Sequence, residues 1–262
     1  MAHQNIIYRC PNAAPFVKYQ PLCYAFIASV LRPHVFYKAI TMRKIAVSLI
    51  TLLGLCSFGS YGQLIEMKTQ RLTPLDVSTI KVVYSAPVTN SSIADLMKAL
   101  DGITMNYPNT KQVSLYINSP GGDMDAGYAG YSAIKNFSLP VETVNLSQVA
   151  SAATLLYCAA QNRRSMPDAF FLLHPAALPM NNVSGELKPN DIKTLSQSLS
   201  IGNNLFASIY KQCTKYDAAA LDTILSSEAN RKLLYFNEAQ TQGLITQTAT
   251  EMKPVDVAYY IN

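Results

Sequence analysis

The first 62 residues contain no aspartate or glutamate, and they carry six of the basic residues. The other 15 lysines and arginines are balanced by all 16 acidic residues, although the whole chain has a formal charge of +5. Because the excess positive charge lies at one end, a nucleic-acid-binding surface on the rest of the chain is not supported, and no nucleic-acid partner is expected. Sustained heptads and a Gly-X-Y repeat are also absent, which excludes a long coiled coil and collagen.

Cysteine is scarce beyond this region, where only Cys158 and Cys213 remain of five. Two isolated cysteines form neither a disulfide framework nor a zinc motif, so the sequence predicts no metal and no cofactor. Of the 262 residues, 49% are hydrophobic, which is enough for a sizeable buried core. The composition therefore indicates a globular protein.

The acid-free region ends in the three parts of an export signal. Arg43 and Lys44 follow an internal methionine, Met42, and give a short positive segment. Residues 45–55 are apolar, and residues 56–62 are small and polar. This order is typical of a secretory signal peptide.

The pattern divides the chain into three parts. Residues 42–62 are expected to be the signal peptide, cleaved before Gln63, and residues 1–41 fit no part of the pattern and are interpreted as an upstream extension. The apolar segment is shorter than the ~20 residues that span a bilayer, and an uncleaved membrane anchor is the alternative. The mature protein is therefore expected in the periplasm or another extracytoplasmic space.

Residues 63–262 have the length of one domain and alternate between strand and helix patterns. Strands are expected over residues 78–85, 113–118, 141–146 and 169–174, with a last one near residues 243–245. Helices are expected over residues 91–100, 125–137, 150–160, 191–211 and 218–225. Residues 176–187 are polar and turn-rich, which favours a hairpin or a flexible excursion. Strands separated by helices of this length predict an α/β fold of repeated parallel βαβ units.

Three positions in this pattern are candidates for chemistry. Gly121 and Gly122 lie in a turn between a strand and a helix, where free backbone N–H groups can bind an anion. Ser151 lies at the start of an apolar helix, where a serine also serves as a small packing or capping residue. His174 is the last residue of an expected strand and the only histidine after residue 62. The carboxyl ends of strands are where α/β domains place working residues.

Three segments of the sequence resemble the signature segments of the Clp protease proteolytic subunit family in their order and spacing. They are residues 115–122 (LYINSPGG), 148–152 (QVASA) and 171–175 (FLLHP). The resemblance implies a ClpP-like, crotonase-like single domain with a long helix after the histidine. It also implies that Ser151 is the nucleophile, that His174 is its general base, and that the N–H groups of Gly121 and Ala152, beside Gly122, form the oxyanion hole.

The third member of the family's triad is an aspartate, and its position falls on Arg231. Asn230 is the first choice for this role, because asparagine orients the histidine in some hydrolases. Glu228 and Asp222 are the substitutes. A Ser-Lys mechanism, with Lys188 or Lys193 as the base, is an alternative on the same fold.

The expected function is that of an exported serine-type endopeptidase that cleaves short or unfolded chains. A homo-oligomeric ring is expected from the long helix over residues 191–211, and no ATPase partner is expected because export removes the chain from ATP. Two other readings stay open: a catalytically weak or inactive scaffold, and a crotonase-like acyl-CoA enzyme. The export signal argues against the latter.

Overall fold

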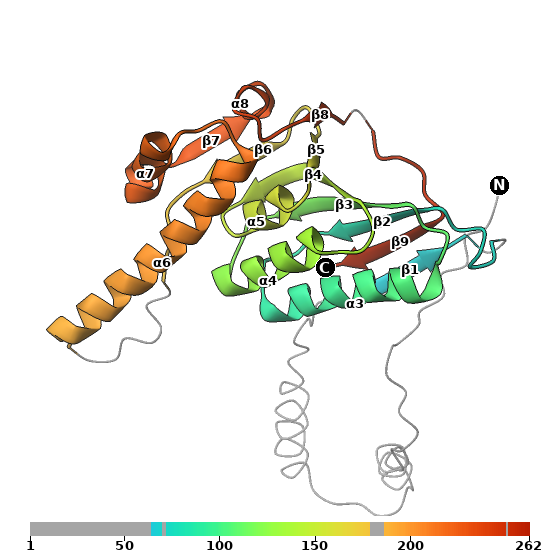
Figure 1. The fold of residues 1–262 in the computed structure, drawn as a ribbon, viewed down its shortest axis with the longest axis horizontal. Coiled ribbons are helices and arrows are strands. Elements are labelled where there is room, and N and C mark those ends of the chain that lie inside the picture. The colour runs from blue at the N-terminus through green and yellow to red at the C-terminus, as the bar shows by residue number, and fades with distance from the viewer. Residues whose placement is uncertain (1–63, 70–71, 179–185, 250) are drawn as a thin grey trace, which may run out of the picture. The chain divides into compact units, whose positions relative to one another are not determined.

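The computed structural model describes residues 64–69, 72–178, 186–249 and 251–262 (Figure 1). The expected upstream extension and signal peptide lie outside these residues. The expected hairpin over residues 176–187 also falls mostly outside them. Within the described part of the chain, no helix is long and apolar enough to cross a membrane.

One mixed sheet organises the domain. Its strands are β1 (Leu64–Lys68), β2 (Thr79–Tyr84), β3 (Gln112–Ser119), β4 (Val141–Ala150), β5 (Asn162–Ser165), β6 (Phe170–Leu173), β7 (Lys232–Tyr235), β8 (Gln247–Thr248) and β9 (Val257–Ile261). They run in the order β1-β9-β2-β3-β4-β5-β8, while β6 pairs with β4 and β7 pairs with β6. Strands β2, β3, β4 and β5 are parallel neighbours, which confirms the expected βαβ units.

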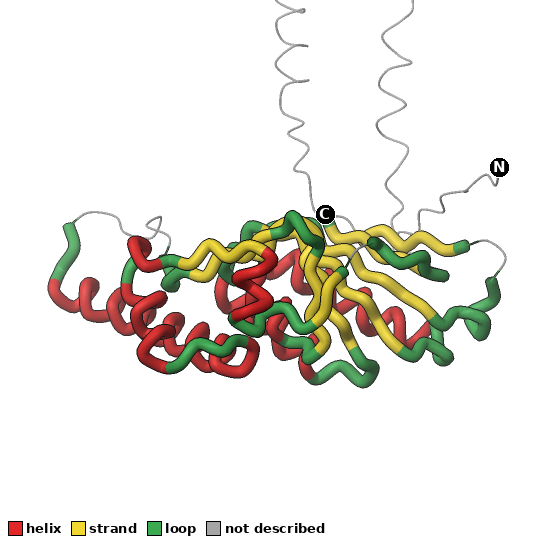
Figure 2. Tube along the Cα trace, turned by 90° about the horizontal axis from the view of Figure 1, so that it is seen from above, coloured by secondary structure: helices red, strands yellow, loops and turns green. Residues whose placement is uncertain are grey.

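Helices cover one face of this sheet. The described helices are α3 (Asn90–Asn106), α4 (Met124–Lys135), α5 (Ala153–Cys158), α6 (Pro189–Cys213), α7 (Ala218–Ser226), α8 (Phe236–Thr241) and the one-turn 3-10 helix η2 (Glu228–Asn230). Figure 1 shows α3, α4 and α5 in front of the strands, and Figure 2, turned by 90°, shows helices on one side of them. The main core lies between these two layers.

Helix α3 illustrates how local sequence builds this layer. The side chain of Thr89 accepts a hydrogen bond from the N–H of Ser92, and the Ser92 hydroxyl accepts one from the N–H of Thr89. Ile93, Leu96 and Leu100 follow at helical spacing and are buried against the sheet. Burying one such side chain contributes about 1.5–3 kcal/mol, so this apolar stripe fixes which face of α3 meets the strands.

Two expected elements are corrected by the structure. Residues 150–160 do not form one helix, because β4 continues to Ala150 and pairs there with Leu172 of β6 before α5 begins. Residues 243–245 themselves are not a strand: they form an irregular connection with Leu244 and Ile245 buried in the core, and the strand expected near them is β8, two residues later. The C-terminal strand β9 was not expected, and it inserts between β1 and β2.

The two cysteines of the domain form a disulfide, which the sequence did not predict. Cys158 ends α5 and Cys213 ends α6, and 55 residues separate them in the sequence. Their Cα atoms lie 5.6 Å apart. Spacing in the sequence gave no sign of this pairing, because packing of α5 against α6 brings the two helix ends together.

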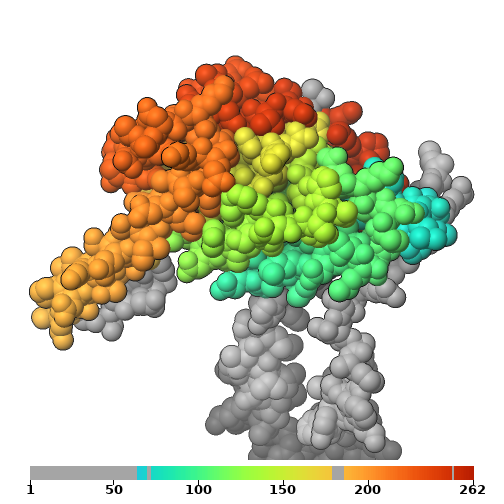
Figure 3. Space-filling model, viewed as in Figure 1, coloured from blue at the N-terminus to red at the C-terminus, as the bar shows by residue number. Residues whose placement is uncertain are grey.

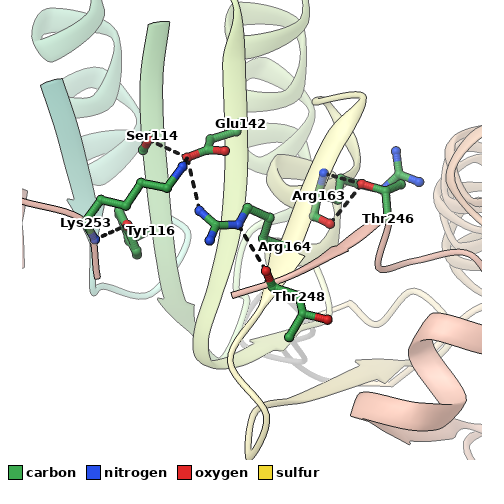
Figure 4. Close-up of polar contacts among 8 residues, drawn as sticks. All are labelled: Ser114, Tyr116, Glu142, Arg163, Arg164, Thr246, Thr248 and Lys253. Carbon is green, nitrogen blue, oxygen red and sulfur yellow. Dashed lines mark hydrogen bonds and ion pairs between the residues drawn. The ribbon is translucent and has the colours of Figure 1, made fainter. Parts of the chain in front are cut away.

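The other face of the sheet carries a polar network that holds the C-terminal segment (Figure 4). The buried carboxylate of Glu142 accepts a 2.7 Å hydrogen bond from Ser114 and lies 3.5 Å from Arg164 Nη1 and 3.7 Å from Lys253 Nζ. The backbone N–H of Lys253 donates to the Tyr116 hydroxyl at 3.2 Å. These contacts direct the chain back across the sheet to β9.

Candidate active site

Ser151 lies on the turn between β4 and α5, at the carboxyl edge of the sheet. Its N–H donates to the carbonyl oxygen of Leu172 at 3.0 Å, which extends the β4–β6 pairing by one residue. Its φ of 54° is left-handed, and no other non-glycine residue in the described part of the chain has a positive φ. Holding a serine there costs about 1–3 kcal/mol, so its surroundings must impose the conformation. A strained strand-to-helix turn of this kind presents a nucleophilic serine in other hydrolases.

The backbone of Gly121 packs directly against this turn. A Cβ atom at Gly121 would lie 2.5 Å from the Ala150 carbonyl oxygen, 2.5 Å from Ser151 Cβ and 3.0 Å from the Ala152 nitrogen. Its φ of 91° also favours glycine. The close approach therefore requires glycine, and it places the Gly121 backbone against the Ser151–Ala152 peptide, where the resemblance implies an oxyanion hole.

The loop around the second glycine, Gly122, pairs with Val88, which lies between β2 and α3. Val88 donates its N–H to the Gly121 carbonyl oxygen at 2.8 Å, and the Asp123 N–H donates to the Val88 carbonyl oxygen at 2.8 Å. The N–H of Gly121 itself donates to Ser119 Oγ at 3.2 Å. An oxyanion that accepts a hydrogen bond from the Gly121 N–H would therefore replace Ser119 Oγ as its acceptor or share the N–H with it.

His174 directly follows β6, the strand that pairs with β4. The register aligns Ala150 with Leu172, so Ser151 and His174 emerge from neighbouring strands at the same edge. The imidazole Nδ1 lies 3.0 Å from Oε1 of Glu228. When Nδ1 carries the proton and donates it to this carboxylate, Nε2 keeps its lone pair and is able to act as a base.

The residue beside His174 is therefore Glu228, the substitute, and not Asn230, the first choice. Asn230 Nδ2 donates to Ser226 Oγ at 3.0 Å, and Asp222 is exposed on α7. The physical reason is the single turn of η2, which is capped by Ser227 and directs Glu228 and Asn230 to different neighbours. The sequence contained the carboxylate but not the direction of its side chain.

The two lysines of the alternative mechanism belong to the start of α6. Lys188 is the N-cap residue, and its N–H donates to Asp191 Oδ2 at 3.0 Å. Lys193 is exposed one turn later. In Figures 1 and 2 this end of α6 lies away from β4 and α5, which bracket Ser151.

The chain is similar to Clp protease subunits both in sequence and in structure. A family model described as Clp protease matches residues 69–252. Proteolytic subunit 2 of the ATP-dependent Clp protease of Treponema denticola is 32% identical over 148 residues, or 56% of this chain and 70% of that protein. Subunit 2 of Leifsonia xyli is 31% identical over 174 residues, or 66% and 75%.

Subunit 1 of the Clp protease of Chlamydia caviae is 37% identical over 100 residues, or 37% of this chain and 52% of that protein. The chain thus spans between half and three quarters of the length of these relatives. Among solved structures, a ClpP1 mutant from Listeria monocytogenes matches with a TM-score of 0.56 and 20% identity, covering 65% of this chain and 91% of that one. At that identity the likeness concerns the fold.

The fold and the site first define a class of protein: a single-domain, ClpP-like α/β fold with a serine and a histidine at the carboxyl edge of a parallel sheet. The match to the Clp protease family model then identifies the family, because it covers more than half of the chain. The chain belongs to the Clp protease family, whose members are serine peptidases. The resemblance and the fold class expected from the sequence are both confirmed.

Proposed function

We propose that the protein is an exported serine-type endopeptidase that cleaves short or unfolded chains without an ATPase. The observation that carries this proposal is the strained Ser151, packed against Gly121 and next to the strand that ends at His174. A serine hydroxyl is a poor nucleophile near neutral pH unless a base takes its proton. The neighbouring imidazole, hydrogen-bonded to Glu228, is a suitable base.

In the proposed reaction, Ser151 Oγ bonds to the carbonyl carbon of the scissile peptide while its proton passes to His174 Nε2. The carbonyl π electrons move to the oxygen, which accepts hydrogen bonds from the N–H groups of Gly121 and Ala152. The C–N bond then breaks, and the leaving amine takes the proton from the imidazolium. Water attacks the acyl-enzyme by the same steps, which releases the acid and restores Ser151.

Glu228 takes the third role in this proposal, in place of Asn230. Its carboxylate would hold the Nδ1–H tautomer of His174 and stabilise the imidazolium that forms. The Glu228 side chain is 57% exposed, so water competes for it and its contribution is smaller than that of a buried triad aspartate. The presence of this carboxylate favours a peptidase over an inactive scaffold.

A fluorophosphonate probe, which phosphonylates activated serines, tests the assignment. We expect labelling and peptide hydrolysis by the wild-type protein, and a loss of at least about 10³-fold in Ser151→Ala and His174→Ala. Lys188→Ala and Lys193→Ala are the matched controls and keep near-normal activity. Loss of activity in Lys193→Ala with retention in His174→Ala would establish the Ser-Lys mechanism instead. An unlabelled wild-type protein would favour the scaffold or the acyl-CoA enzyme.

Export is proposed on the signal sequence at Met42 and on the Cys158–Cys213 disulfide. Disulfides persist in the periplasm and outside the cell and are rare in the cytosol. Residues just after the expected cleavage site belong to the sheet, because β1 pairs with β9. Since such compartments lack ATP, the proposed peptidase acts on chains that are already short or unfolded.

A homo-oligomeric ring is proposed from helix α6. Its buried residues all lie at or beyond Gly202, while on the same face before that point Leu195 and Leu199 are only half-buried and Ile192 is 56% exposed. Figure 3 shows this part of α6 (gold) extending away from the rest of the described surface. An apolar stripe without a partner in its own chain is typical of an interface.

A further inference from the structure

The carbonyl oxygen of Ser151 is held by two hydrogen bonds from one residue. Thr154 donates its backbone N–H at 2.9 Å and its Oγ1 hydroxyl at 2.6 Å. The first bond is an ordinary feature of a helix start, whereas the second depends on the threonine side chain. The strained residue is therefore fixed at its carbonyl as well as at its N–H, which donates to Leu172.

The Thr154 hydroxyl has a second partner on the long helix. The Tyr210 hydroxyl of α6 lies 2.8 Å from Thr154 Oγ1, and both residues are fully buried. Each hydroxyl has one proton. Because Thr154 gives its proton to the Ser151 carbonyl, Tyr210 must donate to Thr154, and the chain runs from Tyr210 through Thr154 to Ser151.

Tyr210 is well suited to act as this donor. Burial raises the pKa of its phenol above the ordinary value, so the hydroxyl keeps its proton throughout the physiological range. Its ring stacks on Phe206 with centroids 5.5 Å apart. One turn further along both helices, the Cys158–Cys213 disulfide joins α5 to α6. The donor therefore has little freedom to move relative to the turn that it supports.

The same hydrogen bonds also determine the direction of the Ala152 N–H. The Ser151 carbonyl and the Ala152 N–H belong to one peptide group, which is planar and trans, so the two bonds point in opposite directions. Fixing the carbonyl toward Thr154 therefore fixes the N–H on the other side. The Ala152 nitrogen lies 3.0 Å from a Cβ position at Gly121, on the side where the oxyanion hole is proposed.

We propose that Thr154 and Tyr210 are positioning residues, which orient the Ser151–Ala152 peptide so that its N–H stabilises the oxyanion. This inference rests on the proposed function of Ser151. The long helix thereby acts on the chemistry through a buried hydroxyl chain, in addition to any role in assembly. Because an oxyanion exists in the transition state and not in the bound substrate, the effect belongs to kcat and not to KM.

The test compares variants in hydrolysis of a fluorogenic peptide and in the rate of fluorophosphonate labelling. Tyr210→Phe removes the hydroxyl and keeps the ring, and Thr154→Val removes the hydroxyl of the threonine. We expect Tyr210→Phe to lower kcat and the labelling rate constant about threefold to tenfold, and Thr154→Val about tenfold, with KM within about twofold. Thr154→Ser, which keeps a hydroxyl at this position, should hold kcat and the labelling rate constant within about twofold of wild type.

The matched control is Tyr116→Phe, which removes the hydroxyl of another fully buried tyrosine. That hydroxyl accepts from the Lys253 N–H at 3.2 Å, on the face of the sheet that carries the polar network. We expect it to lower the unfolding midpoint as much as Tyr210→Phe does while leaving kcat unchanged. The double variant Thr154→Val with Tyr210→Phe should be no slower than Thr154→Val alone, because the two hydroxyls act in series.

Three results would overturn the inference: a wild-type kcat in Tyr210→Phe, an equal kcat loss in Tyr116→Phe, or additive losses in the double variant. With a labelled wild-type protein, each of these removes the positioning role and leaves the proposed peptidase intact. A wild-type protein that neither labels nor hydrolyses removes both proposals together.

Discussion

Nδ1 of His174 and Oε1 of Glu228 lie 3.0 Å apart, although 54 residues separate them in the sequence. The antiparallel pairing of β6 with β7 aligns Leu173 with Lys232 and so brings η2 beside the histidine. The contact gives this chain a carboxylate at its imidazole, although the position expected for the family's aspartate falls on Arg231.

Glu228→Gln should lower kcat for peptide hydrolysis. An exposed carboxylate is partly replaced by water, so we expect a loss of roughly 10²-fold, below the ~10⁴-fold that follows loss of a buried triad aspartate. Asn230→Ala is the matched control, two residues away in the same turn, and should stay within about threefold of wild type. Steady-state kinetics on one fluorogenic peptide measures kcat for both variants and shows which side chain supports His174. A larger loss in Asn230→Ala than in Glu228→Gln would return the third role to Asn230.

Removing the disulfide should destabilise the domain without preventing catalysis. It closes a loop of 55 residues, for which loop-closure entropy predicts a contribution of about 4 kcal/mol. We expect Cys158→Ala with Cys213→Ala to lower the urea unfolding midpoint of the domain that starts at Gln63. Reducing agent should shift the wild-type midpoint to that of the variant and leave the variant unchanged. Identical wild-type midpoints with and without reductant would show that the bond does not form.

The C-terminal segment should weaken in acid through Asp256. Hydrogen bonds from the Ser78 N–H first, and then from Thr79 and both hydroxyls, lower the pKa of this carboxyl below its ordinary value. A lowered folded-state pKa stabilises the protein above the unfolded pKa of about 3.8, and this contribution is lost as pH falls through the folded value.

Asp256→Asn should therefore lower the thermal midpoint at neutral pH, and its difference from wild type should shrink below about pH 3.8. Asp101→Asn, an exposed change on α3, serves as the control and should leave the midpoint unchanged at neutral pH. A gap between Asp256→Asn and wild type that is constant from neutral pH down to pH 2 would contradict the linkage.

The apolar stripe on α6 should mediate assembly. Ile192→Glu with Leu195→Glu places two charges on the proposed interface, and we expect sedimentation velocity at micromolar concentration to show a smaller species than the wild type. Met105→Glu, at a side chain that is 80% exposed on α3, is the matched control and should sediment like wild type. A wild-type protein that is monomeric and still cleaves peptides would remove the assembly proposal.

The exported protein should begin at Gln63, because the positive, apolar and small-residue segments align on that junction. N-terminal sequencing of the protein from the extracytoplasmic fraction measures this directly. Protein in the membrane fraction that retains Met42 would indicate the uncleaved anchor. A soluble cytoplasmic species that retains residues 1–62 would rule out export.

The sequence by itself determined the parallel βαβ core and the places of Gly121, Ser151 and His174. These follow from local patterns, since alternation and helical spacing mark the elements and a turn motif needs few neighbours. The limits of those elements were less well predicted. Strand β4 runs on to Ala150 because β6 supplies pairing partners that local spacing does not reveal.

Tertiary structure alone decided which carboxylate meets His174, which hydroxyls support Ser151 and which cysteines pair. Glu228 and Asn230 are two residues apart and differ in the direction of their side chains, which η2 and its capping set. Tyr210 reaches Thr154 across 56 residues, and Cys213 reaches Cys158 across 55. Contacts at such separations arise when whole helices pack against each other, and packing depends on the shape of the entire core, which no local pattern contains.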